Sequence, residues 1–141
     1  MQRWTWLLVL IGGGLVAYSS GGGRLTLQVG LVIACVVLLA WWLSPLSHGK
    51  SKKMAAVMAL PAEDRRVVIY WRPGCMFCQR LRGALGRQGR SAQWINIWQD
   101  DEAAAFVRSV NGGNEVVPTV VIDDVPHTNP DPALVKTALA A

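Results

Sequence analysis

Two long apolar stretches stand at the start of the chain, and a segment of mixed polarity follows them. From Trp4 to Leu43 the only charged residue is Arg24, whereas the sequence after Leu46 has the charge density of a soluble protein. The stretch 25–43 would form a helix of roughly 28 Å, close to the hydrocarbon thickness of a bilayer. The predicted membrane anchor covers residues 1–46, with transmembrane helices at about 4–20 and 25–43.

Basic residues at the ends of these stretches indicate how the anchor is oriented. Lys50, Lys52 and Lys53 follow the second stretch and Arg3 precedes the first, whereas the connection between them offers only Arg24. Because cytoplasmic flanks of membrane helices carry the excess of Lys and Arg, we expect both ends in the cytoplasm. The prediction is a multi-pass protein of the cell membrane, in contact with membrane lipid, whose remaining domain is cytoplasmic. Three glycines interrupt the first stretch, so a signal-like segment is its alternative, and the domain would be cytoplasmic in either case.

Residues 47–65 are expected to link the anchor to a folded domain. Lys52 to Leu60 could form a short amphipathic helix on the membrane surface, with its lysines at the lipid headgroups. A flexible tether is the alternative that the same residues allow.

The rest of the chain, 66–141, alternates between strand and helix patterns. Val67 to Trp71 is a continuous apolar run, as in a buried strand. Asp100 can cap a helix with an acidic first turn, and the glycines after Asn111 can end that helix. The expected strands are 67–71, 93–98, 116–122 and 125–127, and the expected helices are 79–85, 101–110 and about 130–139. The order βαβαββα predicts a small mixed sheet flanked by helices.

Cys75 and Cys78 stand where the first strand gives way to a helix. A thiol at a helix N-terminus meets unpaired backbone N–H groups and the positive end of the helix dipole, and both favour the thiolate that attacks disulfides. The cysteines lie about one helical turn apart, so Cys78 can attack a mixed disulfide formed at Cys75. The pattern is typical of a dithiol redox motif, with Cys75 and Cys78 as its catalytic residues.

Zinc is the other ligand that two cysteines at this spacing suggest. A structural zinc site needs four ligands, and the chain offers no second cysteine pair. His48 and His127 are the only other soft ligands and lie far apart in the sequence. Cys35, within the second apolar stretch, is interpreted as a small apolar residue. We therefore expect no bound metal and, with only two cysteines facing water, a reducing compartment.

Pro118 falls within the expected third strand, where proline would remove a hydrogen bond of the ladder. A cis Val117–Pro118 bond would resolve this conflict by turning the chain at the start of the strand. The redox motif upstream favours this interpretation over a trans proline at a sheet edge.

The formal net charge of the 141 residues is +5. Part of it comes from the lysines after the anchor and part from Arg80, Arg82, Arg87 and Arg90. These arginines form either a solvated helix face or a surface that attracts anionic partners or lipid headgroups. Basic residues do not alternate with aromatic ones, so nucleic acid is not an expected partner.

Several short motifs accompany the dithiol. They are Tyr70, Cys75-Met76-Phe77-Cys78, Leu81 with Leu85, the segment from Trp98 that ends in Arg108-Ser109-Val110-Asn111-Gly112-Gly113-Asn114, Val117-Pro118-Thr119-Val120, and Thr128-Asn129-Pro130. Together they resemble the mycoredoxins, which are glutaredoxin-like proteins of the thioredoxin superfamily in bacteria that use mycothiol. The resemblance covers about residues 65 to 140. It implies an α/β, thioredoxin-like (glutaredoxin) fold for the βαβαββα domain, preceded here by the expected transmembrane hairpin.

The same resemblance implies an enzyme, a thiol–disulfide oxidoreductase whose substrates are mixed disulfides of proteins with a low-molecular-weight thiol. Cys75 would attack the mixed disulfide, release the reduced protein and retain the small thiol. A second thiol molecule would then regenerate the Cys75 thiol, or Cys78 would displace the small thiol to give an intramolecular disulfide. Mycothiol is the expected co-substrate, and no bound cofactor is expected.

Roles in substrate binding follow from positions in these motifs. Phe77 would offer an apolar wall to the small thiol, and Val117 would pair through its backbone with the substrate. Arg72 could favour the Cys75 thiolate if its side chain comes close. The expected substrate-binding residues are Arg72, Phe77, Val117, Pro118, Thr119, Thr128 and Asn129. Gly74 and Met76 depart from the family pattern, and since residues around the cysteines tune the redox potential, strength as a reductant stays open.

Two other functions fit the same residues. The domain could be a non-catalytic redox sensor or adaptor, with its hairpin bound to a partner protein. It could also be an electron donor that a flavoprotein reductase recycles. Turnover of a mycothiol mixed disulfide separates these possibilities.

Overall fold

The computed structural model describes residues 5–21, 27–43 and 51–141, which belong to two compact units. The first unit covers residues 1–49 and the second covers residues 50–141. Arg3 and Lys50, on which the predicted orientation partly rests, lie outside the described residues, as do the predicted connection at Arg24 and the start of the linker.

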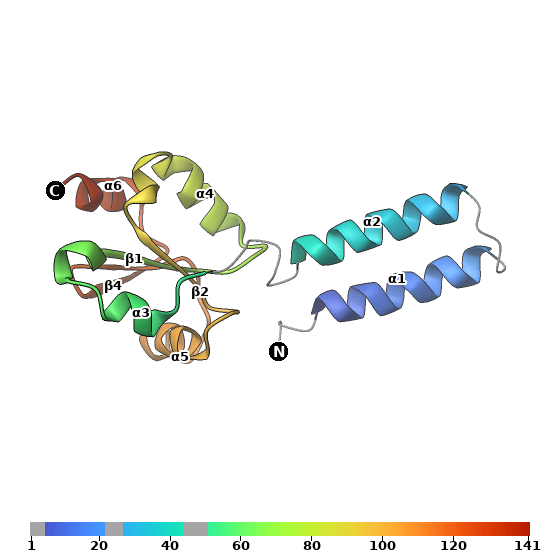
Figure 1. The fold of residues 1–141 in the computed structure, drawn as a ribbon, viewed down its shortest axis with the longest axis horizontal. Helices are drawn as coiled ribbons and strands as arrows, with labels where there is room; N and C mark the ends of the chain where they lie inside the picture. Colours follow the sequence, from blue (N-terminus) through green and yellow to red (C-terminus); the bar gives the residue numbers. More distant parts are fainter. Residues whose placement is uncertain (1–4, 22–26, 44–50) are drawn as a thin grey trace. The chain divides into compact units, whose positions relative to one another are not determined.

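The first unit is a pair of helices, α1 (Thr5–Gly21) and α2 (Leu27–Leu43), which correspond closely to the two expected helices (Figure 1). They pack closely at Gly13, where an added Cβ would come within 2.5 Å of a methyl group of Val36. Neither helix contains a charged residue. None of the helices in the described part of the chain has the length and apolar character needed to cross a membrane.

The second unit contains a four-stranded sheet in the order β2-β1-β3-β4. Strand β1 pairs in parallel with β2 and antiparallel with β3, which pairs antiparallel with β4. The elements are β1 (Val67–Trp71), α4 (Met76–Leu85), β2 (Gln93–Asn96), α5 (Asp101–Val110), β3 (Thr119–Ile122), β4 (Val125–Thr128) and α6 (Pro132–Ala140). The predicted order βαβαββα and the mixed sheet are confirmed.

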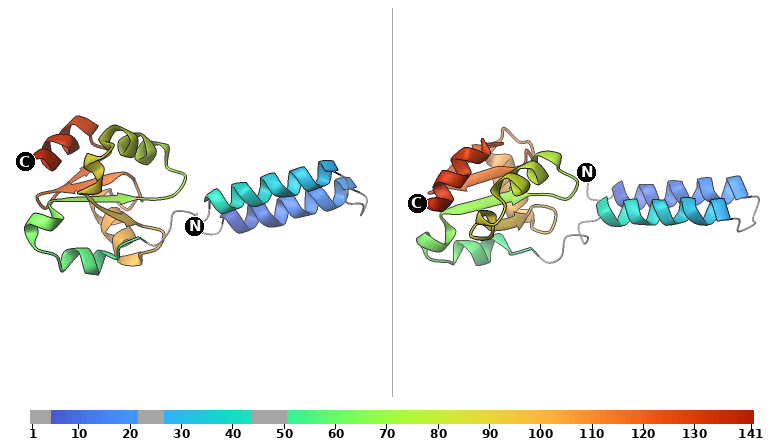
Figure 2. Two further views of the ribbon diagram at one scale, coloured as in Figure 1. Left: turned by 45° about the horizontal axis from the view of Figure 1, so that its top comes forward. Right: turned by 90° about the horizontal axis from the view of Figure 1, so that it is seen from above.

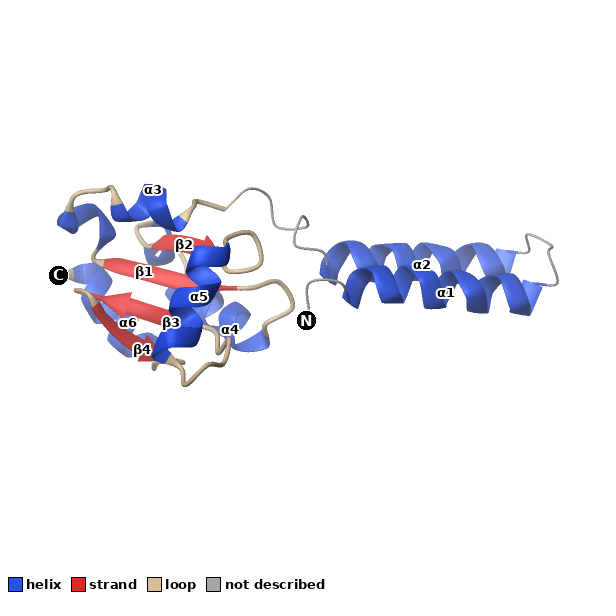
Figure 3. Cartoon of the chain, turned by 90° about the horizontal axis from the view of Figure 1, so that it is seen from below, coloured by secondary structure: helices blue, strands red, loops and turns tan. Residues whose placement is uncertain are grey.

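Both faces of the sheet are covered, α4 and α6 lying on one face and α3 (Met54–Met58) and α5 on the other (Figures 1 and 2). Figure 3 views the sheet with α5 in front of the strands. Successive residues of β1 point to opposite faces, so Val67 and Ile69 pack with the α4 and α6 side, while Val68 and Tyr70 pack with the α5 side. Burial on both faces explains why β1 is a continuous apolar run in the sequence.

Three element boundaries differ from the predictions. Helix α4 begins at Met76 rather than Gln79, because Cys75 caps it. Strand β2 ends at Asn96 rather than Trp98, because the Asn96 side chain accepts a hydrogen bond of 2.9 Å from the Trp98 N–H and turns the chain. Strand β3 begins at Thr119, after the proline that cannot donate to the ladder.

The segment before the sheet differs most from the expectation of a surface helix or a tether. It forms α3 (Met54–Met58) and a 3₁₀ turn (Ala62–Arg65), and Val57 is fully buried in the core beside the α5 face. The backbone N–H of Met54 donates to Asp100 Oδ2 at 2.7 Å, while Asp100 Oδ1 caps α5 by accepting from Ala103 N–H at 3.2 Å. One carboxylate therefore fixes the starts of two helices.

Ser51 adds a second attachment of this segment, at the outer edge of β2. Its hydroxyl donates to the Trp94 carbonyl at 3.2 Å and accepts from the Asn96 N–H at 2.8 Å. These bonds cover backbone groups that an edge strand would otherwise expose. The linker that the sequence predicts over 47–65 is thus, from Ser51 onward, part of the folded domain.

Arg82 departs from the solvated helix face expected for the arginines of this region. Its guanidinium carbon lies 4.6 Å from the ring centroid of Trp71 and 4.5 Å from that of Trp94. Burial between the two rings lowers the pKa of Arg82. The contacts of Arg82 with these two rings join α4 to β1 and β2, and so help to fix the helix that carries the two cysteines.

Candidate redox site

The start of α4 places the two cysteines at different depths. Cys75 is the N-cap residue, with extended backbone angles, and its sulfur accepts a hydrogen bond of 3.1 Å from the Cys78 N–H. The exposed fraction is 8% for Cys75 and 2% for Cys78. Cys75 is therefore the sulfur nearer the surface, while Cys78 lies one turn into the helix.

The two cysteines form a disulfide, with their Cα atoms 5.3 Å apart. The structure thus represents the oxidised state of the site. After reduction, a Cys75 thiolate in the same N-cap position would accept from backbone N–H groups and meet the positive end of the α4 dipole. This local structure suits a sulfur that alternates between disulfide and thiolate.

Val117 brings a second backbone segment to the sulfur. The Val117–Pro118 peptide bond is cis, which confirms the prediction for this proline. The Val117 carbonyl oxygen lies 3.4 Å from Cys75 Sγ. The ladder between β1 and β3 ends at the pair Tyr70–Thr119, so Val117 lies beyond the paired strands and directly beside the disulfide.

Apolar side chains surround the rim of the site. Met76 is 81% exposed and Phe77 is 57% exposed, although both belong to the first turn of α4. Exposed apolar side chains beside a reactive sulfur provide a surface on which a disulfide substrate can pack. The Arg72 guanidinium carbon lies 5.9 Å from the ring centroid of Trp98.

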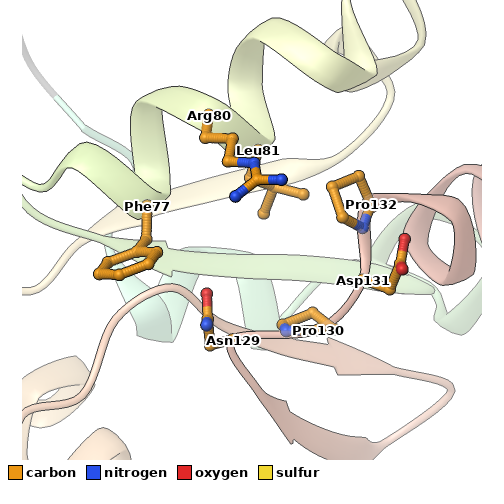
Figure 4. Close-up of a pocket in the computed structure, with 7 residues that line it drawn as sticks. All are labelled: Phe77, Arg80, Leu81, Asn129, Pro130, Asp131 and Pro132. Carbon is orange, nitrogen blue, oxygen red and sulfur yellow. The ribbon is translucent and has the colours of Figure 1, made fainter.

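A pocket of about 330 Å³ opens between α4 and the segment that leads into α6 (Figure 4). Helix α4 contributes Phe77, Arg80 and Leu81 to its lining. The facing wall is the segment Asn129–Pro132, in which Asn129 has a positive φ of 47°. Phe77 therefore belongs both to the dithiol turn and to the pocket, which connects the pocket to the sulfurs.

The structure brings together most of the residues predicted for substrate binding, but it gives the two threonines other surroundings. Thr119 is fully buried, and its hydroxyl donates to the Val116 carbonyl at 2.8 Å. The Thr128 hydroxyl donates to Asn111 Oδ1 at 2.5 Å. Both side chains are thus engaged within the protein, and only Asn129 of the Thr128-Asn129 pair lines the pocket.

Asn111 is the residue of this region that the sequence predictions did not include. Its motif, Asn111-Gly112-Gly113-Asn114, predicts the end of a helix and contributes to the family resemblance but predicts no role in the site, and Asn111 does follow α5 as its C-cap. Its side chain also contacts the residues around the cis proline. The pairing of β3 with β4, which sets Thr119 opposite Thr128, is the signal that could have revealed this.

Metal ligation has no candidate cluster here. Within the described residues, no group of three or more His, Cys, Asp or Glu side chains could hold a metal ion. The chemistry that the site offers is that of its two sulfurs.

A capped cysteine pair facing a cis proline, on a sheet of this topology, defines the class of thioredoxin-like thiol–disulfide exchange proteins. Comparison with known proteins narrows the class. The glutaredoxin family profile matches residues 67–127. Mycoredoxin 1 of Corynebacterium glutamicum is 43% identical over 65 residues, which are 45% of this chain and 80% of that protein. A Mycobacterium tuberculosis protein named Putative glutaredoxin Rv3198A is 40% identical over 74 residues, which are 52% of this chain and 88% of that protein.

The chain belongs to the glutaredoxin family of the thioredoxin superfamily. It is a glutaredoxin-type thiol–disulfide oxidoreductase, as the sequence motifs predicted. The similarity lies in the second compact unit and leaves the helical pair α1 and α2 outside the match.

Proposed function

We propose that the enzyme reduces mixed disulfides between proteins and mycothiol, with Cys75 as the nucleophile. The observation that carries this proposal is the pocket that begins at Phe77, within the dithiol turn, and extends to Asn129. A site for a small thiol must be reachable from the sulfur that attacks, and this pocket shares Phe77 with the turn between the two cysteines. The name of the relative Mycoredoxin 1 supports mycothiol as the thiol.

The reaction proceeds by two thiol–disulfide exchanges. The Cys75 thiolate attacks the mycothiol sulfur of the mixed disulfide, the S–S bond breaks, and the protein cysteine leaves as a thiolate that takes a proton from water. Cys75 then carries mycothiol in a new disulfide. A second mycothiol thiolate can attack this mycothiol sulfur, releasing mycothiol disulfide and the Cys75 thiolate. Alternatively, Cys78 attacks the sulfur of Cys75, releases mycothiol and forms the disulfide present in the structure.

The surrounding residues support these steps in different ways. The Cys78 N–H stabilises negative charge on the Cys75 sulfur, since it already donates to that atom. Val117, held beside the sulfur by Pro118, presents backbone groups to the substrate polypeptide, and Phe77 and Asn129 contact the small thiol. Arg72 contributes positive charge near the start of α4, where a thiolate forms.

The test is turnover of a mycothiol mixed disulfide by the full chain, compared with the glutathione mixed disulfide of the same peptide. Cys75→Ser should abolish turnover. Cys78→Ser should retain turnover if a second mycothiol releases Cys75 directly. It should lose turnover if release depends on Cys78, in which case two further mycothiol molecules or a flavoprotein reductase must reduce the resulting Cys75–Cys78 disulfide before the next cycle. Equal or better turnover of the glutathione substrate would refute the assignment of mycothiol.

The observed Cys75–Cys78 disulfide also favours a second candidate, an electron donor that a flavoprotein reductase recycles. In that case, turnover would require Cys78 and the reductase, and would not respond to added mycothiol. A redox sensor or adaptor would bind the mixed disulfide without turnover.

We further propose that the helical pair anchors the enzyme in the cell membrane, with the redox domain in the cytoplasm. Both helices expose large apolar side chains, among them Leu8 and Leu15 of α1 and Leu27 and Leu31 of α2. An apolar surface of this extent is unfavourable in water and typical of contact with lipid or protein. The uncharged stretch 25–43 is longer than α2, which begins at Leu27. The lysines that follow this stretch favour a cytoplasmic domain.

Fractionation of cells that express the full chain, or a chain without residues 1–46, tests the anchor. The full chain should remain with membranes after alkaline extraction, and the shortened chain should not. A full chain that alkaline extraction releases would refute an integral anchor. A C-terminal reporter that is active only outside the cytoplasm would refute the proposed orientation.

A further inference from the structure

Asn111 forms hydrogen bonds with three separate segments of the redox domain. Its amide Nδ2 donates to the Val107 carbonyl at 2.7 Å and to Thr119 Oγ1 at 3.0 Å, and its Oδ1 accepts from Thr128 Oγ1 at 2.5 Å. The Val107 carbonyl can only accept, which fixes the orientation of the Asn111 amide, and the two threonine hydroxyls can serve the directions that this orientation requires. The three bonds join the end of α5, the start of β3 and the end of β4.

The bond to Thr119 extends to the cis proline. The Thr119 hydroxyl accepts from Asn111 and donates to the Val116 carbonyl at 2.8 Å. Val116 and Thr119 enclose Val117 and Pro118, so the hydroxyl fixes both ends of the turn that faces Cys75. Thr119 is fully buried, so its hydroxyl depends on these two protein partners.

The bond to Thr128 extends to the pocket. Thr128 directly precedes Asn129, which lines the pocket and whose N–H donates to the Pro118 carbonyl at 2.8 Å. A closed set of hydrogen bonds therefore connects Asn111, the proline turn and the pocket wall. If the Asn129 wall of the pocket moved away from the proline turn, the hydrogen bond between Thr128 and Asn111, the hydrogen bond between Asn129 and Pro118, or both would break.

We propose that Asn111 is a positioning residue that sets the distance between the Val117 backbone and the Asn129 wall of the pocket. It touches neither sulfur and acts through Thr119 and Thr128. The inference rests on the proposed function, since these two surfaces are the ones assigned to the polypeptide and the small thiol of a mixed disulfide. Loss of Asn111 should weaken binding of that substrate while leaving the chemistry at Cys75 intact.

Steady-state kinetics of the full chain test this inference, with a peptide–mycothiol mixed disulfide as substrate. Asn111→Ala should raise KM about tenfold and leave kcat within about twofold, since one or two positioning hydrogen bonds are lost while the nucleophile is unchanged. Thr128→Val should raise KM in the same direction, and Thr128→Ser, which retains the hydroxyl, should restore it. Asn114→Ala is the matched control, because the Asn114 side-chain amide makes only long hydrogen bonds within the described residues, to the carbonyls of Asn111 and Gly112 at 3.5 Å.

The KM and kcat values separate positioning from a general loss of structure. A purely structural role would reduce the fraction of active enzyme, so kcat would fall and KM would stay constant. That result, or equal KM values for Asn111→Ala and Asn114→Ala, would overturn the inference. If Asn111→Ala does not fold, the pair Thr128→Val and Thr128→Ser decides, because a Val variant with wild-type KM contradicts the proposal.

The same variants are assayed in parallel with the glutathione mixed disulfide. A wild type that processes only this second substrate would refute mycothiol as the thiol. The KM values of Asn111→Ala and Asn114→Ala for the glutathione substrate would then decide the role of Asn111 independently of which small thiol the enzyme uses.

Discussion

The hairpin of β3 and β4 is held at both of its ends by polar side chains, but the two ends differ in kind. Near the cysteines, neutral hydrogen bonds from Asn111 fix the strands, and Thr119 among them is fully buried. At the opposite end, Arg65 pairs with Asp124 at 2.6 Å and Arg66 with Asp123 at 3.0 Å, and both aspartates are exposed.

The difference concerns how strictly each end determines geometry. A buried hydrogen bond has no water to replace it, so a shift in position has a large cost. An exposed ion pair exchanges readily with water and salt and contributes little to stability. The end that presents Val117 and Asn129 to substrate is the one whose neutral hydrogen bonds meet at the fully buried Thr119, which suits a site that depends on exact distances.

The largest expected effect comes from Thr119→Val at the buried end. The substitution keeps the shape of the side chain but leaves the Val116 carbonyl and one Asn111 N–H without a partner. We expect a loss of about 2 kcal/mol in the free energy of unfolding and a raised KM for the mixed disulfide. Chemical denaturation and steady-state kinetics measure the two effects. Unchanged stability would mean that water reaches these groups, and the contrast between the two ends would lose its basis.

The next effect concerns a buried polar group without a partner near the same end. Tyr70, which pairs with Thr119 in the β1–β3 ladder, is fully buried, and its hydroxyl has no hydrogen-bond partner among the residues that the structure describes. Burial, followed by the negative charge of Asp100, raises the pKa of Tyr70 to about 12. The unfolded chain loses this proton near the ordinary value of about 10, so the folded state holds more protons between the two values.

Stability should therefore be intact below pH 10 and fall as the pH rises toward 12. The decrease from this group is on the order of 2 kcal/mol. Tyr70→Phe removes the titrating group and should flatten the decrease, and at neutral pH it should be neutral or stabilising because it removes an unpaired polar atom. Denaturant midpoints measured at pH 8 and pH 11 make the comparison. If the denaturant midpoint falls by the same amount between pH 8 and pH 11 in the wild type and in Tyr70→Phe, the phenol does not titrate in this range.

Much of this fold was predictable because its signals are local. The apolar run of β1, the cap at Asp100 and the order of elements each depend on residues that are adjacent in sequence. The cis proline required the redox motif in addition. Phe77, which the sequence predicted as a wall for the small thiol, lines the pocket in the structure.

The remaining features depend on contacts between distant residues. Val57 is buried because the sheet offers it an apolar face, and five helical residues carry too little periodicity to reveal this. The role of Asn111 depends on the register that sets Thr119 opposite Thr128, beside the end of α5. No motif in one segment encodes that register, so Thr119 and Thr128 were predicted as substrate contacts rather than as the links to Asn111.

The smallest effect is expected from Asp123→Asn at the exposed end. The hydrogen bond from Arg66 lowers the pKa of Asp123, desolvation opposes this, and the charge of Arg66 adds a further lowering. A lowered pKa contributes stability above the ordinary carboxyl value, and that contribution is lost as the pH falls through the lowered value. Asp123→Asn should therefore match the wild type in kcat and KM, lower the unfolding midpoint slightly at low salt, and lose even this difference in 1 M salt, where the screening length is about 3 Å. A raised KM in this variant would mean that the exposed end also sets the geometry of the site, together with the hydrogen bonds that Asn111 makes with Thr119 and Thr128.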